Sequence, residues 1–437
     1  GYQANELVRI DFGITRTITM VSAQAEGSFT VTFTIDTQAY ATTTITATGV
    51  ISGVVASNLT VFIQPNIILI SPTEGTVGTI ITVRGNGYGA TKLIRINFGI
   101  TGTIQTTSSY SEGSFTTTFT INTQPFGVTS LSAWHEGSQV IAYGTIAIKP
   151  NIIHISPKSG TVGVIITVRG NGFDASRIIE IDLGTTVSIQ LTSTYDEGSF
   201  TTTFTIDTQP YSITTIKARG SDYAVGTIAI LSNIILITPN QGTVGSLVTV
   251  RGNGFGASKT IKLDFGITRT IQVTSTYAEG SFTTTFTVDT QPYGITTIKA
   301  RGSDEASGTY TILPDIILVT PSSGTVGTII TVRGTGYHAN ELLRLEFGTT
   351  KTITTTSTTV EGSFTTTFTI DTQHYGLTTV SAYGTENISS DGTVTILPNI
   401  ILITPTQGTV GTVITVRGNG FDASFNIRLD FGTTPTI

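Results

Sequence analysis

The chain has 437 residues, no cysteine and a formal net charge of −6, and only 11% of its residues are charged. The missing cysteines exclude disulfides, thiolate metal sites and cysteine nucleophiles. The low, slightly acidic charge argues against nucleic acid or an anionic membrane as a partner, since both are bound by a clustered basic face. No apolar run reaches the roughly 18 to 20 residues that a membrane span needs.

The first 65 residues correspond to the later part of a sequence that recurs along the chain. Gly1-Tyr2 aligns with Gly87-Tyr88, so about the first 21 positions of a repeat are missing before residue 1. No signal peptide or initiator Met precedes Gly1. We therefore expect a mature chain, a processed chain or a window on a longer one.

A characteristic phrase opens each later repeat, first as NIILISPTEGTVGTIITVRGNGYG at 66–89. Close copies begin at Asn151, Asn233, Asp315 and Asn399, at intervals of 82 to 85 residues. A unit of this length is a small domain rather than a turn of a solenoid. The predicted segments are a partial repeat at 1–65, complete repeats at 66–150, 151–232, 233–314 and 315–398, and the opening strands of another repeat at 399–437.

Every repeat alternates apolar and polar residues with a period of two. Phe200, Phe204 and Ile206 fall on one face of an expected strand, and Thr201, Thr203 and Thr205 fall on the other. Gly-rich turns such as Gly-Asn-Gly at 170–172 separate about seven such strands in some 83 residues. This pattern predicts an all-β fold of tandem Ig-like antiparallel β-sandwiches.

The opening phrase resembles the IPT/TIG family of Ig-like domains through Ile70-Ser71-Pro72, Gly75–Gly78 and Ile81–Tyr88. The later half, from Gly113 through Phe119 to Ala133, is similar to Ig-like repeats of bacterial and archaeal surface proteins. The resemblance implies an extracellular or cell-surface array from a prokaryote. DNA-binding members of the family use basic loops, which this chain lacks, so that activity is not implied.

The repeats follow one another without a flexible linker, as in Thr395–Leu402. We therefore expect them to be joined end to end as a stiff rod. The run Ile-Ile-Leu-Ile at 67–70 is apolar on both of its alternating faces. One face can enter its own core, and the other is then free to meet the next domain or another chain.

No recurring residues suggest catalysis, a cofactor or a metal site, so the chain is not expected to be an enzyme. The histidines at 135, 154, 338 and 374 each occur in one repeat only and belong to no HExxH, CxxC or GxSxG element. A glutamate recurs at 26, 112, 197, 279 and 361 before a glycine. A solvated hairpin turn explains it better than a calcium ligand.

One arginine recurs in every copy of the opening phrase, at Arg84, Arg169, Arg251, Arg333 and Arg417. An acidic or amide residue recurs downstream at Asp11, Asn97, Asp182, Asp264, Glu346 and Asp430. We predict a structural role for the arginines, as cross-strand partners of these residues.

Other candidate sites are weaker. Asn58 and Asn387 begin acceptor sequons for N-glycosylation. Trp134, the only tryptophan, is expected to be an isolated surface or edge residue. Tyr110, Tyr195 and Tyr277 recur two residues before the glutamate of the turn, but the outer repeats have other residues there.

The segments at the two ends suggest how such arrays join. Residues 399–419 contain the opening strands that residues 1–65 lack. In one hypothesis the tail of one copy completes the head of the next by strand donation, although residues 420–437 duplicate 1–18 and would compete. In the other, the chain is a window on a longer repetitive polypeptide. The candidate assembly residues are Ile400, Ile401, Leu402, Ile403, Val413, Ile414 and Val416.

Both hypotheses predict an extracellular filament or surface fibre whose partners are copies of itself, with the cell surface or glycans as further candidates. The alternatives are the rigid stalk of a cell-surface adhesin and a carbohydrate-binding accessory array.

Overall fold

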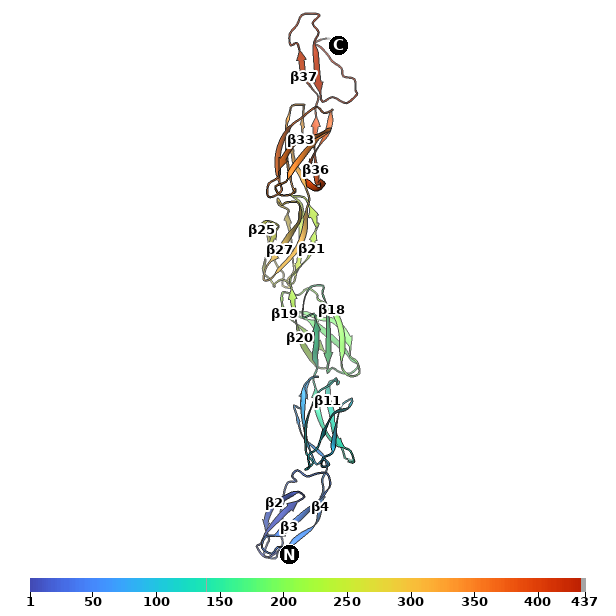
Figure 1. Ribbon diagram of the computed structural model, residues 1–437, viewed down its shortest axis with the longest axis vertical. Helices are drawn as coiled ribbons and strands as arrows, with labels where there is room; N and C mark the ends of the chain where they lie inside the picture. Colours follow the sequence, from blue (N-terminus) through green and yellow to red (C-terminus); the bar gives the residue numbers. More distant parts are fainter. Residues whose placement is uncertain (139, 434–437) are drawn as a thin grey trace. The chain divides into compact units, whose positions relative to one another are not determined.

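The computed structural model describes residues 1–138 and 140–433, apart from the side chain of Asn58. The last four residues of the predicted segment 399–437 therefore lie outside the described part. The chain divides into two compact units, residues 1–206 with 213–229 and residues 207–212 with 230–437. Strands account for nearly all regular structure in both units (Figure 1).

The repeat at 66–150 shows the arrangement that the other complete repeats share. A three-stranded sheet has the order β10-β7-β5, and a five-stranded sheet has the order β6-β12-β11-β8-β9. Neighbouring strands are antiparallel, except that the short β6 runs parallel to β12. The strands are β5 (Asn66–Ser71), β6 (Glu74–Gly75), β7 (Ile80–Asn86), β8 (Leu93–Phe98), β9 (Thr101–Ser108), β10 (Phe115–Thr120), β11 (Gly127–His135) and β12 (Ala142–Ile148).

This strand order is that of an Ig-like sandwich, which confirms the predicted fold of tandem β-sandwiches. The opening strand is divided between the two sheets. Its first half, β5, joins β7, and its second half, β6, joins β12 on the other side of the core. The bond between Ser71 and Pro72, where the chain leaves β5, is cis, as are its counterparts in the later copies.

The core forms because each strand turns alternate side chains between the sheets. On β8, Ile94, Ile96 and Phe98 are fully buried, while Arg95 is exposed. The outward positions are rich in threonine, a β-branched residue that suits a solvated strand face. The predicted inward residues Phe200, Phe204 and Ile206 are 1%, 5% and 1% exposed, so the alternation identified the buried face correctly.

The remaining complete repeats use the same strand order. The repeat at 151–232 contains β13 (Asn151–Ser156), β14 (Ser159–Thr161), β15 (Ile165–Asn171), β16 (Ile178–Leu183), β17 (Thr186–Ser193), β18 (Phe200–Thr205), β19 (Ser212–Arg219) and β20 (Tyr223–Leu231). The repeat at 233–314 contains β21 (Asn233–Thr238), β22 (Gln241–Gly242), β23 (Leu247–Asn253), β24 (Thr260–Phe265), β25 (Thr268–Ser275), β26 (Phe282–Thr287), β27 (Gly294–Arg301) and β28 (Glu305–Ile312). The repeat at 315–398 contains β29 (Asp315–Thr320), β30 (Ser323–Gly324), β31 (Ile329–Thr335), β32 (Leu342–Phe347), β33 (Thr350–Ser357), β34 (Phe364–Thr369), β35 (Gly376–Tyr383), the 3₁₀ helix η1 (Thr385–Asn387) and β36 (Ser389–Ile396).

Candidate assembly site

The head fragment, residues 1–65, is an open half of such a sandwich. Its single sheet has the order β2-β1-β3-β4 and is formed by β1 (Leu7–Phe12), β2 (Thr15–Ser22), β3 (Thr42–Gly49) and β4 (Val55–Phe62). Its buried cluster holds only Val8, Ile10, Ala23 and Ala47. Tyr88, Phe115 and Phe119 of the core of repeat 66–150 have counterparts here that are only partly buried, namely Tyr2, Phe29 and Phe33. Phe12, the counterpart of Phe98, is fully buried.

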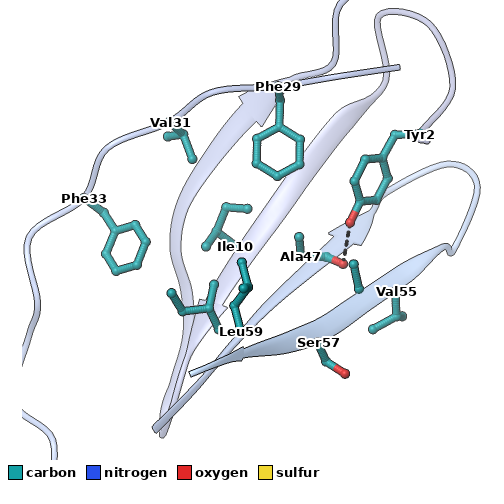
Figure 2. A pocket seen from close by; sticks show the side chains of 11 residues that line it. Tyr2, Ile10, Phe29, Val31, Phe33, Ala47, Val55, Ser57 and Leu59 are labelled. Atoms are coloured by element: carbon teal, nitrogen blue, oxygen red, sulfur yellow. Dashed lines mark hydrogen bonds between the residues drawn. The ribbon is translucent and has the colours of Figure 1, made fainter. Parts of the chain in front are cut away.

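An apolar groove of roughly 600 Å³ lies on the inner face of this sheet. Figure 2 shows Phe29, Val31 and Phe33 along one side, on irregular chain, with Ile10 and Ala47 on the strands opposite. Tyr2 lies at one end, where its hydroxyl donates a 3.0 Å hydrogen bond to the carbonyl oxygen of Ala47. The side chains that would form a core therefore line an open surface.

The irregular segment 29–34 differs from its counterparts in conformation rather than in sequence. The pattern Phe-Thr-x-Thr-Phe-Thr forms β10, β18, β26 and β34 in the complete repeats. These strands pair with β7, β15, β23 and β31, respectively. The head fragment contains no such strand. We attribute the missing ladder to the missing partner.

The tail fragment, residues 399–433 of the described chain, provides a strand pair of the corresponding kind. β37 (Asn399–Thr404) pairs antiparallel with β38 (Thr415–Asn419), with Asn399 opposite Asn419 and Thr404 opposite Thr415. β5 and β7 pair in the same register, with the same shift within the strand. In Figure 1 this hairpin, at the red end of the colour scale, is surrounded by irregular chain.

All the candidate assembly residues on this hairpin are exposed, by 38% to 85% of their surface. Their counterparts in repeat 66–150 divide them into two sets. Ile414 and Val416 correspond to Ile81 and Val83, which are fully buried. Ile400 and Ile403 correspond to Ile67 and Ile70, which pack against the core.

The other three candidates correspond to residues that stay outside even in a complete repeat. Ile401 and Leu402 match Ile68 and Leu69, which are 52% and 40% exposed. Val413 matches Ile80, which is 63% exposed. The bulge after Ile67 turns two consecutive side chains outward, and a simple alternation did not predict it.

A joint between consecutive repeats also recurs, and sequence analysis missed it. The side-chain amide of Asn86, the last residue of β7, donates to Thr37 Oγ1 of the preceding segment at 3.0 Å. The backbone N–H of Tyr40 donates to the carbonyl oxygen of Tyr88 at 2.9 Å. The same asparagine bond is found for Asn171 with Thr123, Asn253 with Thr208 and Asn419 with Thr372.

A buried glutamine holds each joint loop in place. Gln124 is fully buried, and its side-chain nitrogen donates to the carbonyl oxygen of Phe98 at 3.2 Å, while its oxygen accepts from the N–H of Ile100 at 3.0 Å. The loop that carries Thr123 is thereby tied to the β8–β9 turn of its own repeat. The recurrence of Thr-Gln at 37–38, 123–124, 208–209, 290–291 and 372–373 is the sequence signal for this device.

One joint lacks the asparagine. Thr335 occupies its place, and Thr335 Oγ1 is buried without a hydrogen-bond partner among the described residues. The backbone bond from Tyr293 N–H to the Tyr337 carbonyl oxygen remains, at 2.9 Å. His338 adds an edge-to-face ring contact with Tyr293, with centroids 4.9 Å apart.

The predicted cross-strand pairing of the recurring arginines is wrong. Arg84 on β7 lies opposite Thr116 on β10 and Leu69 on β5, whereas Asn97 lies on β8 in the other sheet. The chain changes sheets between β7 and β8, which the period-two pattern could not reveal. The downstream acids pair with other cations: Arg9 with Asp11, Arg219 with Asp182, Arg301 with Asp264, Arg344 with Glu346 and Arg428 with Asp430.

The other candidates lie in different places. Asn387 is exposed in η1, whereas Asn58 lies within β4 and its side chain is outside the described part. Trp134 is half-buried beneath the guanidinium group of Arg95, 5.5 Å from its ring. His135 is 3% exposed and contacts the ring of Tyr40 edge-on across a joint; burial lowers the pKa of His135.

Within the described residues, no group of three or more His, Asp or Glu side chains is placed to hold a metal ion. Among the same residues, no helix is both long and apolar enough to span a membrane.

No protein-family model matches the chain, and a comparison with curated proteins found no match. Solved structures that align with it include a tetra-tandem repeat from the extending region of a large adhesion protein. That alignment has 13% identity and a TM-score of 0.21, and it covers 76% of this chain and 99% of that one. Invasin, a bacterial integrin-binding protein, aligns with 14% identity and a TM-score of 0.22 over 78% of this chain and 80% of that one.

A Ca²⁺-stabilised adhesin of an Antarctic bacterium that binds ice aligns with 12% identity and a TM-score of 0.16. The alignment covers 76% of this chain and 98% of that one. Likenesses at this level carry no argument about function, and the fold assignment rests on the strand order of the repeats.

Proposed function

We propose that this chain is a segment of an extracellular fibre of tandem Ig-like repeats on a prokaryotic surface, with a structural or adhesive role rather than a catalytic one. Its composition supports this role, because cysteine is absent and the strand faces are rich in threonine. The complete repeats share one fold, and the asparagine bond recurs at all but one of the joints.

The finer proposal is that the opening strand pair of one copy completes the head fragment of the next. One observation supports it: the hairpin β37–β38 corresponds to the pair β5–β7 of a complete repeat, and the groove of the head corresponds to the face that this pair covers. In repeat 66–150 the pair β5–β7 helps to cover Phe115 and Phe119, which are 1% and 6% exposed. Their counterparts in the head are Phe29 and Phe33, which line the groove.

Residues 420–433 correspond to the first 14 residues of the head, which include β1, and would compete for the same place. Among these residues only Phe431 forms an isolated β-bridge, and none belongs to a strand. The proposal therefore requires that they remain outside the completed sandwich while β37 and β38 enter it.

The experiment is a disulfide test, which suits a chain without native cysteine. In repeat 66–150 Thr82 lies directly opposite Thr118, and the corresponding positions are Thr415 in the tail and Thr32 in the head. The 437-residue chain carrying Thr32→Cys and Thr415→Cys should give oxidised species at multiples of 46.0 kDa on a non-reducing gel. A control with Thr32→Cys and Val416→Cys places one thiol on the opposite face and should not cross-link.

A folded double variant that stays monomeric, with both thiols titratable, would contradict exchange between copies. The mass of the native material then tests the other arrangement. A single polypeptide much heavier than 46.0 kDa would mean that neighbouring sequence of the same chain completes the head.

The stalk of a surface adhesin is the second candidate. Such a stalk needs the same contacts between consecutive repeats but no strand exchange between copies. Separate arrays in electron micrographs would favour it. The exposed rings of Tyr110, Tyr195 and Tyr277, each 60% accessible, are the residues to substitute in a glycan-array test of the carbohydrate-binding alternative.

A further inference from the structure

The first strand of each three-stranded sheet lies at the edge of that sheet and carries an unusual pair of side chains. In repeat 233–314, β21 pairs only with β23 in its sheet, and its bulge lies between Ile234 and Leu236. Ile235 and Leu236 are consecutive, yet both point outward, with exposures of 42% and 40%. A bulge normally protects an edge strand from pairing with another chain, but here it also presents two aliphatic side chains to water.

This exposed pair recurs in the other copies, as two aliphatic residues except in repeat 151–232, where the second is a histidine, although most outward positions around it are threonine. The equivalents are Ile68 and Leu69, Ile153 and His154, Ile317 and Leu318, and Ile401 and Leu402. The inward neighbours Ile234 and Ile237 already pack on the core. The fold of a single repeat therefore does not need the outward pair to be apolar.

A recurring cation and a recurring anion lie beside the pair. Arg251 is opposite Leu236 on the neighbouring strand, and it lines a hollow of about 260 Å³ together with Ile235 and Glu279. Within the described part of the chain, neither Arg251 nor Glu279 forms a salt bridge. The Glu279 carboxylate accepts a 2.8 Å hydrogen bond from the Ser281 hydroxyl. The patch therefore presents an aliphatic centre beside one charge of each sign, neither of them in a salt bridge.

We infer that this patch is a lateral contact surface for a second copy of the chain, related to the first by a local two-fold axis. Such an axis places each aliphatic pair against its equivalent and brings the arginine of one copy to the glutamate of the other, so the surface is complementary to itself. The bulge interrupts the edge ladder, so side-chain packing rather than strand addition makes the contact.

The repeat supports a second copy over an unrelated partner. A chain that carries this patch in several repeats offers a second copy several equivalent sites, so contacts that are weak singly can combine. The contact lies on the flank of the repeats and is independent of the proposed exchange between head and tail.

A charge-exchange experiment tests the pairing. One variant of the 437-residue chain carries Arg84→Glu, Arg169→Glu, Arg251→Glu and Arg333→Glu, and a second carries Glu112→Arg, Glu197→Arg, Glu279→Arg and Glu361→Arg. Each alone should associate laterally at least ~10-fold more weakly than the parent in sedimentation velocity, and an equimolar mixture should recover the association. Added salt should weaken the parent and the mixture.

A second pair of variants tests the aliphatic centre. Threonine at Ile68, Leu69, Ile235, Leu236, Ile317 and Leu318 should sharply reduce side-by-side pairing in negative-stain images without lowering the melting temperature. The matched control places threonine at Val128, Ile213, Ile295 and Leu377, which are 69% to 77% exposed on the other sheet, and should pair normally.

A parent chain that does not pair laterally would overturn the inference. Folded charge variants that associate as strongly as the parent would also overturn it, as would an equimolar mixture that does not recover lateral association. Each variant is also prepared with Thr32→Cys and Thr415→Cys, and disulfide cross-linking between these positions is measured separately from lateral pairing. Loss of lateral pairing is therefore distinguishable from loss of exchange between ends.

Discussion

The side-chain amide of Asn171 donates a 3.0 Å hydrogen bond to Thr123 Oγ1 and so ties the turn after β15 to a loop of the preceding repeat. The carbonyl oxygen of the same amide accepts from the N–H of Gly172 at 2.8 Å. With only 4% of its surface exposed, Asn171 shapes its own turn and joins two domains at once.

We predict that Asn171→Ala weakens this joint by about 1 kcal/mol, because it removes one hydrogen bond to a side chain and another within the turn. Denaturant unfolding of the 437-residue chain and amide exchange of Phe126, whose N–H bonds to Phe173 across the joint, provide the measurements. The reciprocal change Thr335→Asn should slow exchange of Tyr293. Unchanged exchange at Phe126 in a folded Asn171→Ala chain would show that the bond contributes nothing.

The buried Gln124 offers a larger effect. Gln124→Ala leaves the N–H of Ile100 and the carbonyl oxygen of Phe98 without their side-chain partner, and a buried polar group left unpaired costs about 1–3 kcal/mol. We expect a lower unfolding midpoint and faster amide exchange around Thr123. Gln241→Ala, at an exposed position, is the control and should behave like the parent.

Glycine is required at position 172 for two separate reasons. Its φ is +76°, and a Cβ there would meet the carbonyl oxygen of Lys149. Gly137 has a φ of +92° but open space around the corresponding point. Gly137→Ala should cost about 1–2 kcal/mol from backbone strain alone, whereas Gly172→Ala should cost more and also disturb the joint. Equal midpoints for the two variants in thermal unfolding would refute the steric part of this argument.

Glu6 links the stability of the head fragment to pH. The backbone N–H of Ser52 donates to its carboxylate, as do those of Gln3 and Ile51 at 2.9 Å, and these bonds lower its pKa to about 2. Because the folded pKa lies below the unfolded value of about 4.3, the stabilisation is present above that value. It is lost as the pH falls toward 2.

Amide exchange of Ile51 and Ser52 between pH 6 and pH 3 measures this loss. In the parent, the protection of these amides should fall with pH beyond the intrinsic trend. Glu6→Gln should show weaker protection that depends less on pH. Equal pH dependence in the two proteins would count against the role of this carboxylate.

Much of the fold could be predicted because alternation along one strand is a local property. The inward set of Phe200, Phe204 and Ile206 needed only the sequence of that strand. The outward turn of Leu402 and the partners of Arg84 depend on how strands meet, which a local pattern does not contain. Gln124 was missed because an amide in a loop looks like solvated polar sequence until the groups around it are placed.

Residues 29–34 have the sequence of a strand and the irregular conformation of a loop, because a ladder needs two members. While the groove is open, the apolar side chains that line it have not gained the free energy of full burial. Full burial of an exposed ring contributes about 1.5–3 kcal/mol, and completing the burial of Phe29 and Phe33, which are already partly buried, would contribute a part of this for each. In the proposed exchange, the arrival of the strand pair is the last step in the folding of that domain, so joining and folding are one reaction.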